Sequence, residues 1–172
     1  HHALAQKCAA ESIVLLENDG ILPLSKNAKV AVIGDFAKAP RYQGAGSSQV
    51  NPTKFDNLYD CLSEAGVEIV AYAQGFNRRK PAPDQDLIAQ AVEVAKSAET
   101  VLLCVGLDEI LESEGMDRLH MELSKSQQAL IKAVCEVNKN VILVLSGGAP
   151  FVMPEAGTYR AAIHGYLGGQ AG

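Results

Sequence analysis

The sequence contains no tryptophan among its 172 residues, and aromatic side chains make up only 5% of the chain. It also lacks an excess of basic residues, because its formal net charge is -5. A nucleic-acid-binding surface needs clustered Lys and Arg. The one basic cluster, Arg78 to Lys80, lies beside Pro81 in what we predict to be a surface turn. We therefore expect no nucleic-acid partner.

Long apolar runs are absent as well. No segment approaches the ~20 apolar residues that a membrane-spanning helix needs. The N-terminal residues do not show the charged and then hydrophobic pattern that is typical of a signal peptide. We expect no membrane partner.

Cysteine is sparse and unpaired in sequence. Cys8, Cys61, Cys104 and Cys135 are far apart, and each falls within a predicted helix or strand rather than in a CxxC motif. We expect all four to be small buried hydrophobic side chains. Secreted domains of this size usually use cysteines to cross-link their loops. The pattern therefore favours a cytoplasmic protein over a secreted one.

The periodicity of apolar residues predicts alternating helices and short strands. We expect helices over residues 3–18, 55–65, 85–97 and 124–138, and strands over residues 29–33, 67–71, 100–105, 140–145 and 161–164. Such alternation predicts an α/β fold with a mostly parallel, doubly wound sheet in three layers, flavodoxin-like or a six-stranded α/β sandwich. We expect one domain over residues 1–172, with a leading helix and connector over 1–27 and the sandwich over 28–172.

The two longest polar loops follow the first and third predicted parallel strands, over residues 34–52 and 106–123. In a flavodoxin-like sheet, the point where strand order reverses lies between these two strands, and ligands bind there. We therefore expect the GAGSS and ESEGMDR segments of these loops to share one crevice.

The first loop contains Gly44, Gly46, Ser47 and Ser48. Glycines and serines after a strand are compatible with a phosphate cradle, but neither the GxGxxG fingerprint nor a P-loop is present. A solvated loop with tight turns is an equally good interpretation. A nucleotide-binding regulator is thus one alternative function.

The second loop is acidic. Some of its carboxylates must be solvated or raised in pKa by their neighbours, and a raised carboxyl suits a general acid. Gly115 would let the carboxyl of Glu114 approach a bulky ligand, whereas Asp117 and Arg118 are expected to brace the loop by ion pairing. Residue chemistry alone favours a solvated acidic surface. The six carboxylates are Asp108, Glu109, Glu112, Glu114, Asp117 and Glu122.

No HExxH or Cx2C pattern indicates a metal site. We expect no metal and no cofactor, and we interpret the isolated His120 and His164 as structural.

Five segments in order resemble the second, α/β-sandwich domain of glycoside hydrolase family 3, typified by β-glucosidases. They are AAESIVLLENDGILPL (9–24), KVAVIGDFA (29–37), GAGSSQVNP (44–52), ESEGMDRLHMEL (112–123) and GGQAG (168–172).

The resemblance implies a retaining, exo-acting glycosidase. Its aspartate nucleophile would lie on a preceding (β/α)8 barrel, and its acid/base glutamate would come from this domain. Glu114 matches the acid/base, with Glu112 in reserve. Gly46, Ser47, Ser48, Asp117 and Arg118 are then candidates to bind substrate or brace the loop. The implied partners are a β-glucoside-like carbohydrate and the barrel.

No room remains in 172 residues for eight further βα units. We therefore expect a fragment or one piece of a larger enzyme, inactive by itself, truncated at its C-terminus and with a sheet that is incomplete at one edge. Without tryptophan, aromatic sugar platforms must come from the barrel, Phe36, Phe151 or a tyrosine. A non-catalytic sugar-binding or interaction module of the same fold is the other alternative.

Overall fold

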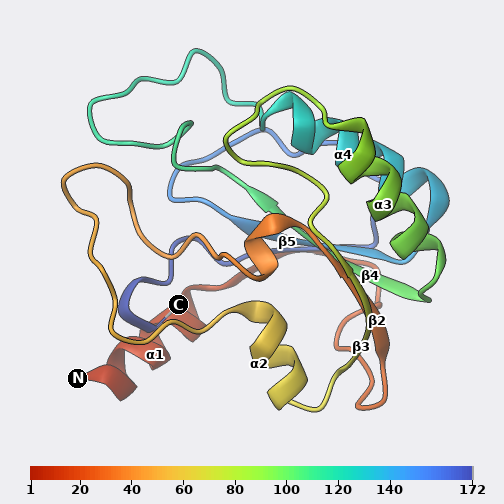
Figure 1. Ribbon diagram of the computed structural model, residues 1–172. Coiled ribbons are helices and arrows are strands. Elements are labelled where there is room, and N and C mark those ends of the chain that lie inside the picture. Colours follow the sequence, from red (N-terminus) through yellow and green to blue (C-terminus); the bar gives the residue numbers. More distant parts are fainter. Residues whose placement is uncertain (172) are drawn as a thin grey trace.

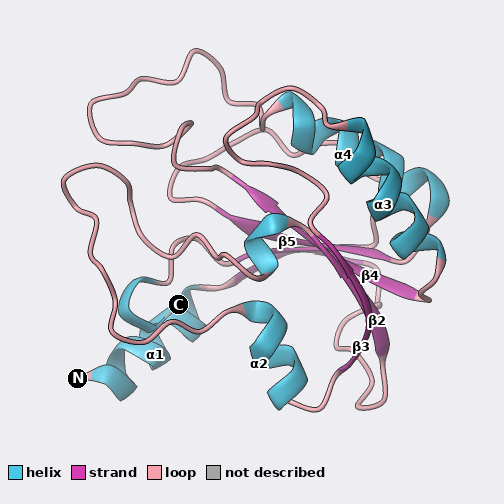
Figure 2. Cartoon of the chain, viewed as in Figure 1, coloured by secondary structure: helices cyan, strands magenta, loops and turns pink. Residues whose placement is uncertain are grey.

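The computed structural model describes residues 1–171, which form one six-stranded sheet with helices on both sides (Figures 1 and 2). The strands are β1 (Val14–Asn18), β2 (Lys29–Ile33), β3 (Glu68–Ala73), β4 (Thr100–Gly106), β5 (Val141–Ser146) and β6 (Ala161–His164). The helices are α1 (His2–Ser12), α2 (Leu58–Glu64), α3 (Gln85–Lys96) and α4 (Lys125–Val137), with two 3-10 helices, η1 (Asp35–Ala37) and η2 (Gly169–Ala171).

The strand order is β1-β6-β5-β4-β2-β3. Strands β2 to β6 are parallel and follow the flavodoxin-like order, whereas β1 pairs antiparallel with β6 at one edge. Helices α3 and α4 lie side by side over one face, and α2 lies on the other (Figure 1). The predicted fold class, a three-layer α/β fold with a mostly parallel sheet, is confirmed.

Strand β1 corrects the prediction of one helix over residues 3–18. Helix α1 ends at Ser12, and Val14–Asn18 pairs with β6 instead. The segment Ile13 to Leu16 is apolar without interruption, so its spacing fits a helix and a strand equally well. Backbone pairing with β6, far away in sequence, decides the conformation.

The core lies around the central strands, because both of their faces are covered. Residues 101–106 of β4 are buried throughout. Each helix over this face begins with a side-chain cap: Asp84 accepts from the N–H of Leu87 at the start of α3, and Ser124 accepts from that of Gln127 at the start of α4.

The four cysteines are free thiols that differ in burial. Cys104 and Cys135 are buried, as predicted, but Cys8 and Cys61 are exposed. The prediction for these two was wrong because α1 and α2, which carry them, contain no buried residue. Their small side chains lie on weakly covered helices.

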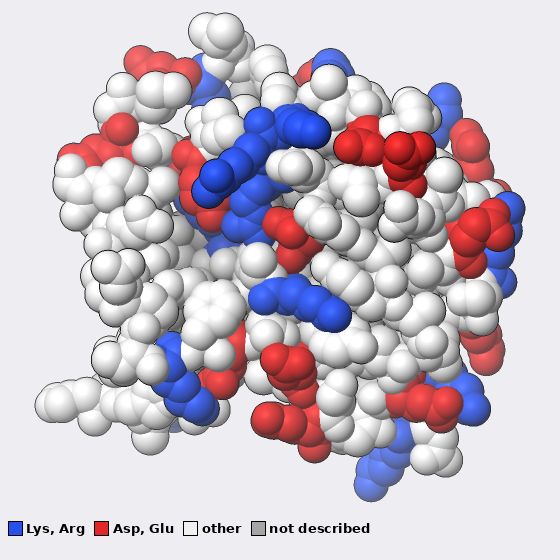
Figure 3. Space-filling model, viewed as in Figure 1, with Lys and Arg blue, Asp and Glu red and all other residues white. Residues whose placement is uncertain are grey.

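The outer surface mixes both signs of charge. Figure 3 shows acidic and basic side chains interspersed over the face in view. Within residues 1–171, no helix combines the length and the apolar character that crossing a membrane requires.

Candidate active site

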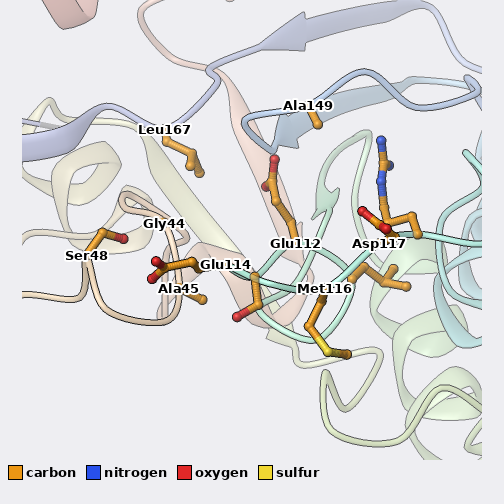
Figure 4. A pocket seen from close by; sticks show the side chains of 12 residues that line it. Gly44, Ala45, Ser48, Glu112, Glu114, Met116, Asp117, Ala149 and Leu167 are labelled. Atoms are coloured by element: carbon orange, nitrogen blue, oxygen red, sulfur yellow. The ribbon is translucent and has the colours of Figure 1, made fainter.

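The loops that follow β2 and β4 meet beside a pocket of about 480 Å³. Both loops project from the same end of the sheet in Figure 1, because β2 and β4 are adjacent parallel strands. The pocket is lined by residues 44, 45 and 48 of the first loop, by 111–114 and 116–118 of the second, and by Ala149 and Leu167 (Figure 4). The predicted crevice shared by GAGSS and ESEGMDR is confirmed.

Glu114 is held against the first loop at two points. Its backbone N–H donates to the carbonyl of Ala45 at 3.2 Å, and its Oε2 accepts from the backbone N–H of Ser47 at 2.8 Å. Gly46, with φ of +92°, makes this approach possible, since a Cβ there would lie 2.8 Å from the Cβ of Glu114. The exposed carboxyl of Glu114 thus lies at the edge of the pocket.

The pKa shifts in the acidic loop differ from what we expected for a general acid. The nearby Ser47 side chain and then the backbone N–H of Ser47, which donates to the carboxylate, lower the pKa of Glu114. The raised pKa belongs to Asp108, because burial disfavours its charged form. In this chain, therefore, the expectation of a raised pKa does not hold for Glu114, since its carboxyl is exposed and hydrogen-bonded.

Glu112 has a different environment from Glu114, and Figure 4 shows their side chains pointing in different directions. The Oε2 atom of Glu112 lies 3.2 Å from Nη1 of Arg41 and accepts from the backbone N–H of Gly148 at 3.0 Å. Ion pairing and a backbone donor thus already engage this carboxylate.

Arg41 is not among the predicted site residues, yet its side chain is only 1% exposed. A single arginine beside a proline in a glycine-rich loop gives no pattern that distinguishes a buried anchor from a surface residue. Its partners, which belong to both loops, are visible only in the folded chain.

Arg118 braces the loop by a contact other than the one we predicted. Its Nη2 donates to the carbonyl of Pro150 at 2.8 Å, and among the described residues it forms no ion pair with Asp117. Its Nη1 is buried without a hydrogen-bond partner. Asp117, Arg118 and Ser48 line the pocket, whereas Ser47 contacts Glu114 directly.

Arg78 lies in a network rather than in the simple surface turn that we predicted. Its guanidinium pairs with Asp35 at 2.6 Å and with Glu109 at 2.9 Å, and its Cζ lies 4.7 Å from the ring centre of Phe36. These contacts join the loops that follow β2, β3 and β4. The charge spacing of the sequence did not reveal this network, because its members are distant in the chain.

Of the two phenylalanines considered as sugar platforms, Phe36 is engaged inside the domain, whereas Phe151 is only partly buried. Phe36 is buried and packs edge-on against Phe76. Phe151 lies 5.6 Å from the ring of His164, measured between ring centres. Phe36 therefore presents no open face to a sugar.

The two histidines that we interpreted as structural, His120 and His164, differ in their surroundings. His120 is exposed, whereas His164 is buried and its Nδ1 accepts from the backbone N–H of Tyr166. Across residues 1–171, no group of three or more His, Cys, Asp or Glu side chains is placed to hold a metal ion.

Comparison with known proteins identifies the family of this chain. Residues 13–172 match the family described as the glycosyl hydrolase family 3 C-terminal domain. The chain is 43% identical over 174 residues to thermostable beta-glucosidase B of Acetivibrio thermocellus, covering 99% of this chain and 23% of that protein. It is 42% identical over 183 residues to an exo-alpha-(1->6)-L-arabinopyranosidase of Bifidobacterium longum, covering 100% of this chain and 24% of that one.

A solved structure agrees as well. The crystal structure of a GH3 beta-glucosidase from Bifidobacterium adolescentis matches with a TM-score of 0.92 and 46% identity, covering 99% of this chain and 25% of that one. The chain thus spans about a quarter of the length of these relatives. The resemblance found in the sequence is confirmed, and the last residue of its GGQAG motif, Gly172, lies outside the described residues. With most of its length matched and these relatives covering nearly all of it, the chain belongs to glycosyl hydrolase family 3 as a C-terminal domain.

Proposed function

We propose that this chain supplies the acid/base glutamate, Glu114, to a retaining, exo-acting β-glucosidase-like enzyme. The nucleophile would be an aspartate on a (β/α)8 barrel of the same polypeptide. We call the polypeptide that contains both domains the complete enzyme. The substrate class, a β-glucoside-like carbohydrate, follows the beta-glucosidases among the relatives.

The observation that carries the proposal is which carboxylates of the acidic loop pair with a cationic side chain and which do not. Glu109 and Glu122 pair with Arg78 and Lys125, and Glu112 pairs with Arg41. Glu114 is exposed, lines the pocket and has no cationic partner among the described residues.

Two other carboxylates of the loop remain. Asp108 is buried, and its Oδ1 accepts from two backbone N–H groups of its own loop. Asp117 lines the pocket like Glu114, but no hydrogen bond positions it in the described structure, whereas Ser47 positions Glu114. Glu114 is thus the loop carboxylate that is both positioned and accessible.

In the first step, the barrel aspartate attacks the anomeric carbon while Glu114 protonates the departing oxygen. In the second, Glu114 acts as a base on water, which displaces the aspartate and restores both residues. Retention of configuration requires the two carboxyl groups to lie about 5–5.5 Å apart. Glu114 must therefore face the barrel across the domain interface.

The lowered pKa of Glu114 in this chain fits the second step better than the first. In the complete enzyme, an ionised aspartate nearby and exclusion of water would both raise the pKa of Glu114, so that it holds a proton before the first step. Once the aspartate is esterified by the sugar, its charge is lost and the pKa of Glu114 falls again. The Ser47 hydrogen bond then favours the carboxylate that activates water.

The test is Glu114→Ala in the complete enzyme, assayed with an activated aryl β-glucoside with and without azide. We expect turnover to fall strongly, and azide to restore it with formation of a β-glycosyl azide of retained configuration. Glu122→Ala is the matched control, because Glu122 lies in the same loop but pairs with Lys125 outside the pocket. Near-normal turnover by Glu114→Ala would contradict the proposal and direct attention to Glu112.

A further inference from the structure

We propose that Arg41 is a positioning residue for the acid/base: through Glu112 it fixes the place from which Glu114 delivers its proton. This inference rests on the proposed role of Glu114. Arg41 itself does not touch the substrate in this scheme.

One buried guanidinium connects the two loops of the site. Nε of Arg41 donates to the carbonyl of Gln43 at 3.2 Å, next to the glycine-rich segment that contacts Glu114. Nη1 donates to the carbonyl of Leu107 at 2.7 Å, where the acidic loop begins. Nη2 donates to the carbonyl of Glu112 at 3.1 Å. Arg41 thus holds the acidic loop at its start and again two residues before Glu114.

The side chain of Glu112 completes this arrangement. Its carboxylate pairs with Arg41 and also accepts from the N–H of Gly148, in the loop after β5. The fit at Gly148 is close, since a Cβ there would lie 2.9 Å from Oε1 of Glu112. Burial makes the pair sensitive, because removing one partner leaves an uncompensated charge.

The path from Arg41 to Glu114 is short. Only Ser113 separates Glu112 from Glu114, and the N–H of Glu114 bonds to Ala45 on the other side. The backbone that carries the acid is therefore fixed before and at Glu114. Loss of Arg41 would release the first of these restraints and leave the second, so that Glu114 would stay near the pocket but lose its exact placement.

A misplaced acid has a specific kinetic signature. A glycoside with a very good leaving group, such as 2,4-dinitrophenolate, needs no proton in the first step, whereas an alkyl alcohol can leave only when protonated. A displacement of about 1 Å can cost on the order of 100-fold in rate. The loss of kcat/KM in an Arg41 variant should therefore increase with the pKa of the leaving group, whereas partial unfolding would lower kcat/KM equally for all substrates.

The experiment compares kcat/KM of the complete enzyme and its variants on 2,4-dinitrophenyl, 4-nitrophenyl, phenyl and methyl β-glucosides. Active sites are counted by stoichiometric labelling with a 2-deoxy-2-fluoro glycoside, which reacts only with folded enzyme. For Arg41→Met we expect a loss below about threefold on the dinitrophenyl substrate, rising to about 100-fold on the methyl glucoside. Glu112→Gln, which keeps the carbonyl contacts of Arg41, should show the same trend with a smaller slope and guards against a failure of Arg41→Met to fold.

Two comparisons make the result decisive. Arg160→Met is the matched control. Arg160 lies just before β6, at the end of the sheet opposite to the pocket, and pairs with Asp19. We expect unchanged kcat/KM on all four substrates. Glu114→Ala should show the steepest dependence on the leaving group, and a uniform loss there would contradict the proposed function. A steep dependence in Glu114→Ala with a uniform loss in both Arg41→Met and Glu112→Gln would overturn the positioning role alone.

Discussion

The Oε2 atom of Glu114 accepts a 2.8 Å hydrogen bond from the backbone N–H of Ser47, although 67 positions separate the two residues in the chain. They meet because Ser47 follows β2 and Glu114 follows β4, and these two strands are adjacent and parallel. The sheet thus positions the candidate acid by contacts that its own loop does not supply.

The first prediction concerns the pKa of Glu114. The Ser47 side chain lowers this pKa more than any other group does. Ser47→Ala removes that side chain and leaves the backbone N–H, so the pKa should rise. Because the protonated acid is needed in the first step, activity falls as pH rises through this pKa. The descending limb of kcat/KM for phenyl β-glucoside should therefore move to higher pH in the complete enzyme.

Ser113→Ala is the control, because Ser113 lines the same pocket without a side-chain hydrogen bond in the described structure. Its pH profile should match that of the unsubstituted enzyme. A descending limb that stays in place or moves to lower pH in Ser47→Ala would show that Ser47 does not set the pKa of the acid.

The second prediction concerns the close approach at Gly46. In Gly46→Ala the new Cβ would lie 2.8 Å from the Cβ and 3.2 Å from Oε2 of Glu114, at a φ of +92°. The strained backbone should cost about 1–3 kcal/mol of unfolding free energy. The displaced Glu114 should also reduce kcat on phenyl β-glucoside by on the order of 100-fold.

Gly157→Ala separates strain from displacement. Gly157 has a similar φ of +84°, and nothing lies within 4 Å of its added Cβ. It should therefore lose similar stability in urea unfolding but keep its kcat. Equal losses of kcat in the two variants would mean that strain, and not contact with Glu114, explains the effect.

The position of the pocket could be predicted because it depends on strand order, and strand order follows from short apolar strands such as Lys29–Ile33 alternating with helices. The conformation of Val14–Asn18 could not be predicted, because its apolar run fits the period of a helix and that of a strand equally well. The burial of Arg41 was not predictable either. Arg41 and Arg78 act through partners on other loops, and nothing in the spacing of charges marks such contacts. Pairings between distant loops become visible only once the chain is folded.

The third prediction concerns Asp108, whose pKa is raised by burial. When the folded-state pKa is above the unfolded-state pKa, the native state binds more protons than the unfolded state between these two values. The free energy of unfolding therefore falls as pH rises through this range. Asp108→Asn cannot ionise, and its Oδ1 can still accept from the N–H groups of Ile110 and Leu111. The variant should therefore lose less stability than the parent chain between the ordinary aspartate pKa of 3.8 and neutral pH.

Urea unfolding at several pH values measures this difference directly. Asp86→Asn serves as the control, because Asp86 is exposed in the first turn of α3. If the stability of Asp108→Asn declined as steeply with pH as that of the parent, burial of this carboxyl would not be what destabilises the native state.

The fourth prediction concerns Gln127, which is fully buried in α4 and fixes the point where the acidic loop leaves the sheet. Its Oε1 accepts from the N–H of Gly106 at 2.8 Å, and its Nε2 donates to the carbonyl of Gly106 at 2.9 Å. Gln127→Leu leaves both buried backbone groups without a partner, at about 1–3 kcal/mol each. The free energy of unfolding should fall by about 2–6 kcal/mol.

Gln90→Leu is the comparison, because Gln90 is exposed on α3 and the same change there leaves no buried group unpaired. Urea unfolding should show a difference below about 0.5 kcal/mol for this variant. Since the side chain of leucine fills much of the same space, a large loss in Gln127→Leu measures the unpaired groups of Gly106 and not a cavity. A loss in Gln127→Leu as small as that in Gln90→Leu would mean that Gly106 finds other partners, and that the acidic loop is anchored without Gln127.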